Sequence, residues 1–226
     1  MSLSTDQISE IKKFINSRGF TYIEVEMEIL DHVASAVEDK LNLNPELSLQ
    51  KAIHEVHAGF GVFGFATIEE EKQKYFHTIL KNEFLKNLKN IVFFKKPLLN
   101  LILIATTILF ISFLNTDNIY TFSYIPLILP FTVMSGVFLR NYKKFRQWKG
   151  KSLMLITSAS LFYVFLFTSG QFTSTIFRDL AETNTQAGAF FLSSCFYLVM
   201  LSAISVSRTM EWGYQWTYER YLKYAG

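Results

Sequence analysis

Two pairs of side chains that can bind metals, one Glu/His pair and one His/His pair, have the spacing of metal ligands. Glu28 and His32 are four residues apart on one predicted helix, and His54 and His57 are three apart on the next. Such spacings place each pair on one helix face, so two packed helices could direct four ligands at one ion. The other interpretation is surface charge and hydrogen bonding, in which a neighbouring acid orients a histidine.

No metal-binding signature such as H-E-x-x-H is present in the chain, so hydrogen bonding is the favoured interpretation of these histidines. We therefore predict no catalytic residue, no metal and no cofactor, and we expect that the protein is not an enzyme. A metal-dependent enzyme using Glu28, His32, His54 and His57 remains the second alternative.

A glycine-rich segment, GFGVFGF at residues 59–65, follows the second histidine pair. Its glycine spacing is that of a dinucleotide fingerprint, but a helix precedes it where the fingerprint needs a strand. We interpret it as a loop between helices in which Phe60, Phe63 and Phe65 fold back over the core. Phe60 and Phe63 are also candidates for contact with a partner.

Aromatic and basic residues alternate in the segment Arg140–Lys151, which holds Trp148, six basic residues and no acid. This composition can bind nucleic acid. Because apolar stretches flank the segment on both sides, a turn at the membrane surface in contact with anionic lipid is favoured, and no nucleic-acid partner is expected. The aromatic tail at 207–226, with Trp212 and Trp216, is interpreted as an amphipathic surface helix or a docking strip.

Half of the residues are hydrophobic, and nearly half of these lie in four stretches without Asp, Glu, Lys, Arg or His. Each is about 18–20 residues long, the length that crosses a bilayer core. The lone Cys195 excludes a disulfide framework. We therefore predict that residues 96–206 form four transmembrane helices: Pro97–Leu114, Tyr120–Leu139, Ser152–Gly170 and Ala187–Val206.

The orientation of these helices follows from charge. Residues 76–96 form a basic collar, and the Arg140–Lys151 loop is also basic, whereas the loops at 115–119 and 171–186 are not. Basic loops stay in the cytoplasm. The sequence thus predicts a multi-pass protein of the inner (plasma) membrane with both termini cytoplasmic.

Residues 1–95 are predicted to form a cytoplasmic all-α domain. Ser4 with Gln7 and Thr21 with Glu24 have capping-box spacing, and Ser48 can cap a third helix. Apolar residues at helical spacing in the second helix predict its core face. These residues are Ile23, Met27, Leu30, Ala34, Val37 and Leu41.

The run Glu28-Ile29-Leu30-Asp31-His32, with Glu38 and the Gly59–Gly61 turn, resembles the HAAS-type bacterial membrane proteins. The likeness covers roughly residues 5–75 and the general layout. It implies a small cytoplasmic helical domain fused to membrane helices and a signalling or regulatory role. The chain departs from that pattern in its turn, where GFGVFGF replaces a shorter Leu-Gly-x-Pro type.

These observations favour a membrane-anchored regulatory or adaptor protein whose helical domain binds another protein. The alternative is an accessory subunit of a transport or secretion complex, or a small transporter, although spans without charge argue against a lone ion carrier. Expected partners are membrane lipid and a protein, and small residues in the fourth span leave a homo-oligomer open. The interaction candidates are Asp31, His32, Phe60, Phe63, Trp148, Trp212 and Trp216.

Overall fold

The computed structural model describes residues 3–94, 97–113, 150–160 and 185–221, with short pieces between 128 and 146 and residue 164. These residues form helices and their connections without any strand, so the predicted all-α class is confirmed for this part of the chain. The chain divides into two compact units, one of Met1–Thr78, Gln147–Thr157 and Thr217–Gly226, the other of Ile79–Arg146 and Ser158–Trp216. The predicted domain boundaries stay predictions.

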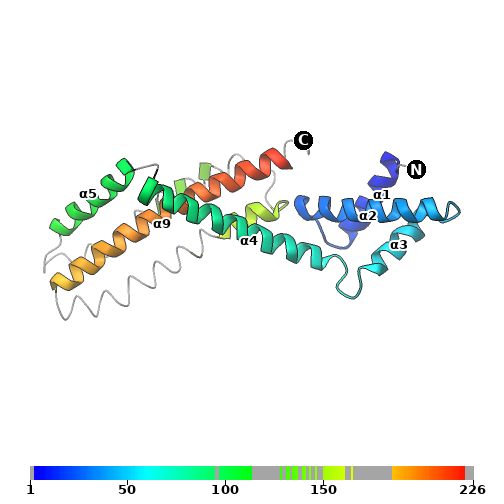
Figure 1. Ribbon diagram of the computed structural model, residues 1–226, viewed down its shortest axis with the longest axis horizontal. Coiled ribbons are helices and arrows are strands. Elements are labelled where there is room, and N and C mark those ends of the chain that lie inside the picture. The colour runs from blue at the N-terminus through cyan, green and yellow to red at the C-terminus, as the bar shows by residue number, and fades with distance from the viewer. Residues whose placement is uncertain are drawn as a thin grey trace. The chain divides into compact units, whose positions relative to one another are not determined.

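The first unit contains α1 (Thr5–Ser17), α2 (Ile23–Leu43), α3 (Leu49–Gly59) and the start of α4 (Ala66–Lys89). Both α1 and α3 pack against α2 (Figure 1). Apolar side chains from all four helices and the loop before α4 are buried in this core. They are Ile11, Ile15, Val25, Ile29, Val33, Val37, Ala52, Ile53, Val56, Phe65 and Phe76.

The helix N-termini in the structure show which of the predicted caps form. Ser4 and Gln7 form the full capping box at α1, with bonds of 2.8 and 3.3 Å, and Ser48 accepts the Lys51 N–H at α3. Those two predictions are confirmed. The predicted box of Thr21 and Glu24 is wrong, because the N-cap of α2 is Tyr22 and no side chain caps it.

The core face of α2 is rotated relative to the prediction. The buried apolar residues are Val25, Ile29, Val33 and Val37, spaced four apart, whereas Met27 is 47% exposed. Only Val37 belongs to both sets. The cause is that α2 carries two apolar stripes, and α1 and α3 cover the β-branched one.

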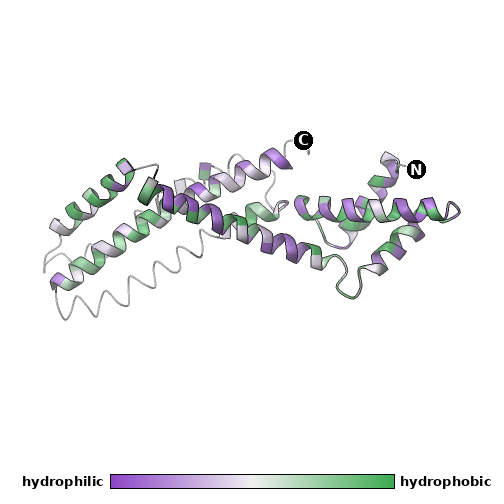
Figure 2. Ribbon diagram, in the orientation of Figure 1, coloured by the Kyte–Doolittle hydropathy of each residue, from purple (hydrophilic) through white to green (hydrophobic). Residues whose placement is uncertain are grey.

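The second unit contains the end of α4, a π-helical turn at Asn90–Phe94, α5 (Pro97–Phe113) and α9 (Thr185–Arg220) up to residue 216. Pro97 opens α5, as predicted from its tolerance of a first turn. The apolar character of α5 and of the first half of α9 is visible in Figure 2.

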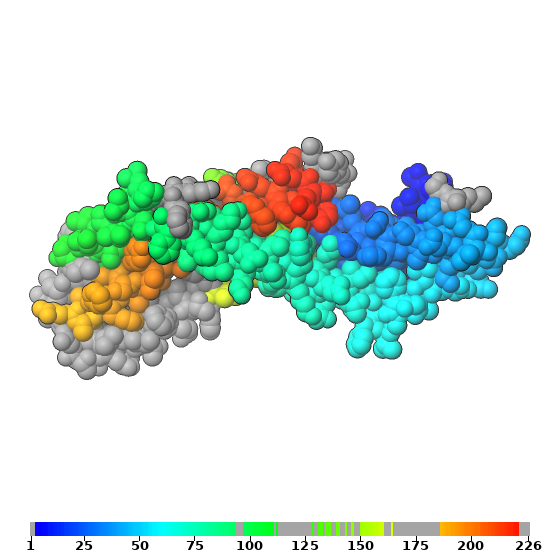
Figure 3. Space-filling view, viewed as in Figure 1, coloured from blue at the N-terminus to red at the C-terminus, as the bar shows by residue number. Residues whose placement is uncertain are grey.

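The helices of this second unit pack through apolar clusters and side-chain hydrogen bonds, and Phe110 of α5 packs against buried Leu192 of α9. Ile91, Leu103 and Leu201 are buried together. The Tyr197 hydroxyl donates to Asn100 Oδ1 at 2.6 Å, which joins α9 to α5. Near its C-terminal end α9 lies beside α4 (Figure 3), and the side-chain amide of Asn87 donates to Thr209 Oγ1 at 3.3 Å.

One described helix, Gln186–Arg220, is long and apolar enough to cross a membrane, and it contains the predicted fourth span. A second candidate arises only if α4 and α5 are taken together as one bent span. Most of the second predicted span and nearly half of the third lie outside the described residues, so the four-helix bundle stays a prediction. Residues 207–220 are helical and continue α9, and the role of the tail as a surface helix or docking strip stays a prediction.

Candidate functional site

A buried carboxylate lies at the start of α2. Glu24 is 1% exposed and accepts the backbone N–H groups of Leu153, at 3.0 Å, and Met154, at 3.3 Å. The hydroxyl of Ser152 donates to the same carboxylate. Both partners of each bond belong to the first unit. The contact therefore joins the helical domain to a segment about 130 residues later in the chain.

The chemistry of this contact is that of a helix cap supplied by another helix. Residues 153–160 are helical, and the first N–H groups of a helix have no partner within it and carry partial positive charge. Glu24 satisfies two of them, and Ser152 Oγ accepts a third from Leu155 at 3.2 Å. A carboxylate is well suited to this position.

The backbone completes the contact in the opposite direction. The Ile23 N–H lies at the start of α2 and therefore has no acceptor within that helix. It donates to the Lys151 carbonyl at 2.8 Å. Each helix start thus satisfies the other. We call Ile23 and Glu24 with residues 151–154 the glutamate clasp.

Tyr221, the residue after the end of α9, belongs to the same unit as the clasp. Burial, together with the nearby carboxylates of Glu24 and Glu28, raises the pKa of the Tyr221 phenol. Negative charge close to a phenol disfavours the phenolate. Tyr221 therefore stays protonated and can serve as a neutral hydrogen-bonding group beside the clasp.

The loop at 59–65 presents two apolar side chains to water. Val62 is fully exposed and Phe63 is 77% exposed, so Phe63 does not fold over the core as predicted. Phe65 does: it is buried, and the rings of His57 and Phe60 contact it edge-on with centroids at 4.9 Å. We call the exposed pair the Val62–Phe63 knob.

Glycines fix the shape of this knob. Gly61 and Gly64 have φ of 75° and 53°, values that cost a residue with a Cβ about 1 kcal/mol or more. With Phe65 anchored in the core, the positive φ values turn residues 62 and 63 outward. The knob is held in place on one side by glycine geometry and on the other by an aromatic anchor.

The four candidate metal ligands belong to two different environments. His32 Nε2 lies 3.8 Å from Glu28 Oε1, and Glu28 also binds Lys72 at 2.6 Å. His54 and His57 instead contact the ring of Phe14 edge-on, at 5.2 and 5.4 Å. Over the described part of the chain, no three His, Cys, Asp or Glu side chains converge on a point where an ion could bind.

Glu28, His32 and Lys72 line a cavity of about 240 Å³ together with Ile68, Glu71 and Tyr75. Lys72 compensates the charge of Glu28, and Glu71 adds a second carboxylate to the lining. Asp31 is exposed beside it on α2. Of the tryptophan candidates, Trp212 and Trp216 contact each other at 6.4 Å, and Trp148 lies outside the described residues.

His57 gives the helical domain a pH dependence. Burial lowers its pKa from the ordinary 6.5, and Arg18 and His54 nearby lower it further. A histidine with a lowered folded pKa contributes stability above the unfolded pKa of about 6.5, and that stability is lost as the pH falls toward the folded pKa. We expect the melting temperature to fall between about pH 7.5 and 5.5, with a shallower fall in His57→Gln. Equal slopes for the two proteins would contradict this assignment.

The glutamate clasp was not predicted from the sequence. The sequence pattern paired Glu24 with Thr21 in a capping box. The available signal was Ser152, an N-cap residue type immediately before an apolar stretch. Nothing in the sequence connects that cap to a glutamate 128 residues earlier.

Comparisons with protein families, with curated proteins and with solved structures find no match to this chain.

Proposed function

We propose that this protein is a membrane-anchored regulatory or adaptor protein whose N-terminal helical domain binds another protein. The Val62–Phe63 knob is the observation that carries the proposal. The domain buries its own apolar core and still leaves two adjacent apolar side chains almost fully in water. A rigid apolar projection of this kind is typical of an anchor that fills a pocket on a partner.

The glutamate clasp supports the regulatory part of the proposal. It bonds the domain directly to Leu153 and Met154, at the start of the predicted third span. A partner that binds the domain either leaves these buried bonds intact or shifts α2 and breaks them. Breaking them is costly, because the Glu24 carboxylate would stay buried without a partner. The clasp is therefore a discrete element through which binding at the domain can influence the apolar part of the chain. The resemblance to HAAS-type proteins is part of the same proposal.

Partner binding can be tested with the double variant Val62→Ser/Phe63→Ser. We expect at least a tenfold lower recovery of the bound protein from gently solubilised membranes, since loss of a buried apolar anchor costs about 2 kcal/mol or more. Leu43→Ser is the matched control, because Leu43 is also an exposed apolar residue of the same domain. Equal recovery by wild type and the double variant, or an equal loss with Leu43→Ser, would contradict the proposal.

The proposed topology places four spans in the inner membrane with both termini in the cytoplasm. Reporters fused after Gly150 and at the C-terminus should read cytoplasmic, because the adjoining loops are basic. Reporters near Asn118 and Thr183 should read external. A cytoplasmic signal at Thr183 would be incompatible with four spans.

A further inference from the structure

A polar groove of about 480 Å³ lies in the second unit between α4 and α9. Its walls are formed by Asn87 of α4, by Asn90 of the π-helical turn that follows α4, and by Arg208, Trp212 and Gln215 of α9. Glu83 and Glu211 also line it. The volume falls in the range of ordinary small-molecule sites. We propose that this groove binds the phosphodiester headgroup of an anionic phospholipid, with Arg208 as its phosphate ligand.

The groove lies where the apolar segments on its two walls end. On α9 the groove residues begin at Arg208, directly after the apolar stretch that ends at Val206. On the opposite wall they end at Asn90, the first residue after α4 and the last before the apolar residues from Ile91 onward. Because Ile91 packs against Leu201, the two apolar segments lie at one level, and the groove follows immediately outside it. If α9 crosses the bilayer, this level is that of the headgroups.

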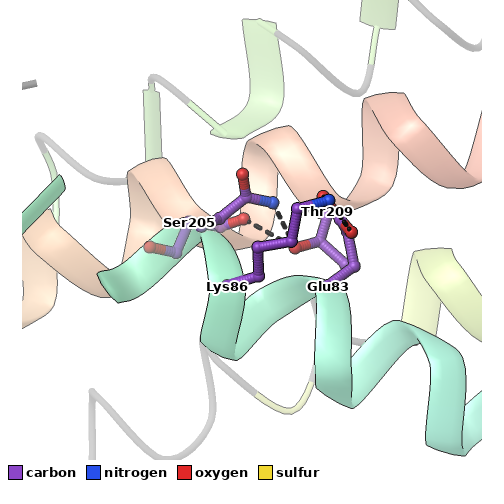
Figure 4. Close-up of polar contacts among 5 residues, drawn as sticks. Glu83, Lys86, Ser205 and Thr209 are labelled. Carbon is purple, nitrogen blue, oxygen red and sulfur yellow. Dashed lines mark hydrogen bonds and ion pairs between the residues drawn. The ribbon is translucent and has the colours of Figure 1, made fainter. Parts of the chain in front are cut away.

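The charges around the groove favour an anionic ligand. Glu83 is paired with Lys86 at 2.9 Å, and Glu211 is paired with Arg140. Figure 4 shows the Glu83–Lys86 pair on α4 next to Thr209 of α9. Both carboxylates are thus neutralised, whereas half-buried Arg208 has no carboxylate partner among the residues that the structure describes. One cation is left over for an anionic ligand.

The side chains of the groove can bind the parts of a phospholipid headgroup. A guanidinium donates paired hydrogen bonds to a phosphate, and the amides of Asn90 and Gln215 offer donors and acceptors for headgroup hydroxyls. Trp212 has the amphipathic ring that is enriched at the membrane–water interface. The predicted cytoplasmic side of the chain is also the side where anionic lipids attract basic residues. This inference depends on α9 crossing the bilayer and is independent of the proposed protein partner.

The test is native mass spectrometry of the full-length, detergent-purified protein with added phosphatidylglycerol, phosphatidylcholine or inorganic phosphate. Wild type should retain phosphatidylglycerol in preference to phosphatidylcholine. Arg208→Gln should weaken phosphatidylglycerol binding about tenfold or more, since a charge-assisted bond to phosphate is lost. Arg208→Lys, which keeps the charge, should retain most of the binding and shows that the position tolerates substitution.

Arg220→Gln makes the same charge change on α9 outside the groove and should leave binding unchanged. The proposal is overturned if Arg208→Gln binds phosphatidylglycerol like wild type, or if Arg220→Gln weakens binding equally. It is also overturned if millimolar inorganic phosphate displaces the lipid, because the groove would then be a site for free anions. A thermal melt of each variant, followed by tryptophan fluorescence, identifies any loss that comes from unfolding.

Discussion

Replacing Glu24 with glutamine should loosen the start of the helix at residue 153 in the full-length protein. The carboxylate accepts the N–H groups of Leu153 and Met154 and the hydroxyl of Ser152. An amide has one acceptor oxygen, and its NH₂ group would face further donors. We expect a loss of about 2–3 kcal/mol, from the range for hydrogen bonds to charged groups and for helix caps.

Hydrogen exchange measures this loss locally. Exchange at the Leu153 and Met154 amides should rise about 30- to 150-fold, which is the same free energy expressed as a population of open states. Glu26→Gln is the matched control, because Glu26 is also a buried carboxylate in the first turn of α2 but binds Asn16 and Lys12 of α1. An unchanged rate in Glu24→Gln, or the same rise in Glu26→Gln, would refute the clasp.

Ile29→Ala should lower the free energy of unfolding of the helical domain by about 2–5 kcal/mol. Ile29 is fully buried on α2, against which α1 and α3 pack, and truncation leaves a cavity as well as removing apolar contacts. Urea unfolding of a fragment of residues 1–90, followed by helical circular dichroism, gives the number directly. Met27→Ala removes a similar side chain from the same helix at an exposed position, and we expect less than about 0.5 kcal/mol.

Leu30→Ala distinguishes the two possible core faces of α2. Leu30 belongs to the face that its spacing predicted, but it is only partly buried. It should therefore cost less than Ile29→Ala. Losses that rank Leu30 or Met27 above Ile29 would mean that α2 is turned to its other stripe in solution.

Local signals in the sequence predicted local structure well. The Ser4–Gln7 box, the Ser48 cap and the helix start at Pro97 depend on residues within a few positions of each other, and all three are present. The clasp could not be predicted, because the partners of Glu24 come from a distant segment. The groove around Arg208 has the same origin, since α4 and α9 are joined only by tertiary packing.

The face of α2 shows an intermediate case. Its sequence contains two apolar stripes, one through Met27 and Leu30 and one through Ile29 and Val33. Periodicity identifies both stripes but does not rank them. Packing against α1 and α3 decides, because the β-branched stripe fits closely between them and the longer, more flexible side chains tolerate partial exposure.

The glutamate clasp also sets an order of events during synthesis. Glu24 leaves the ribosome 128 residues before Ser152, a delay of about 6–26 s at ordinary elongation rates. During that interval the carboxylate has no helix to cap and is hydrated, while α1, α2 and α3 can already pack around Ile29. In the nascent domain the Glu24 carboxylate at the start of α2 is therefore still without its later hydrogen-bond donors. Closure of the clasp marks the arrival of the later segment.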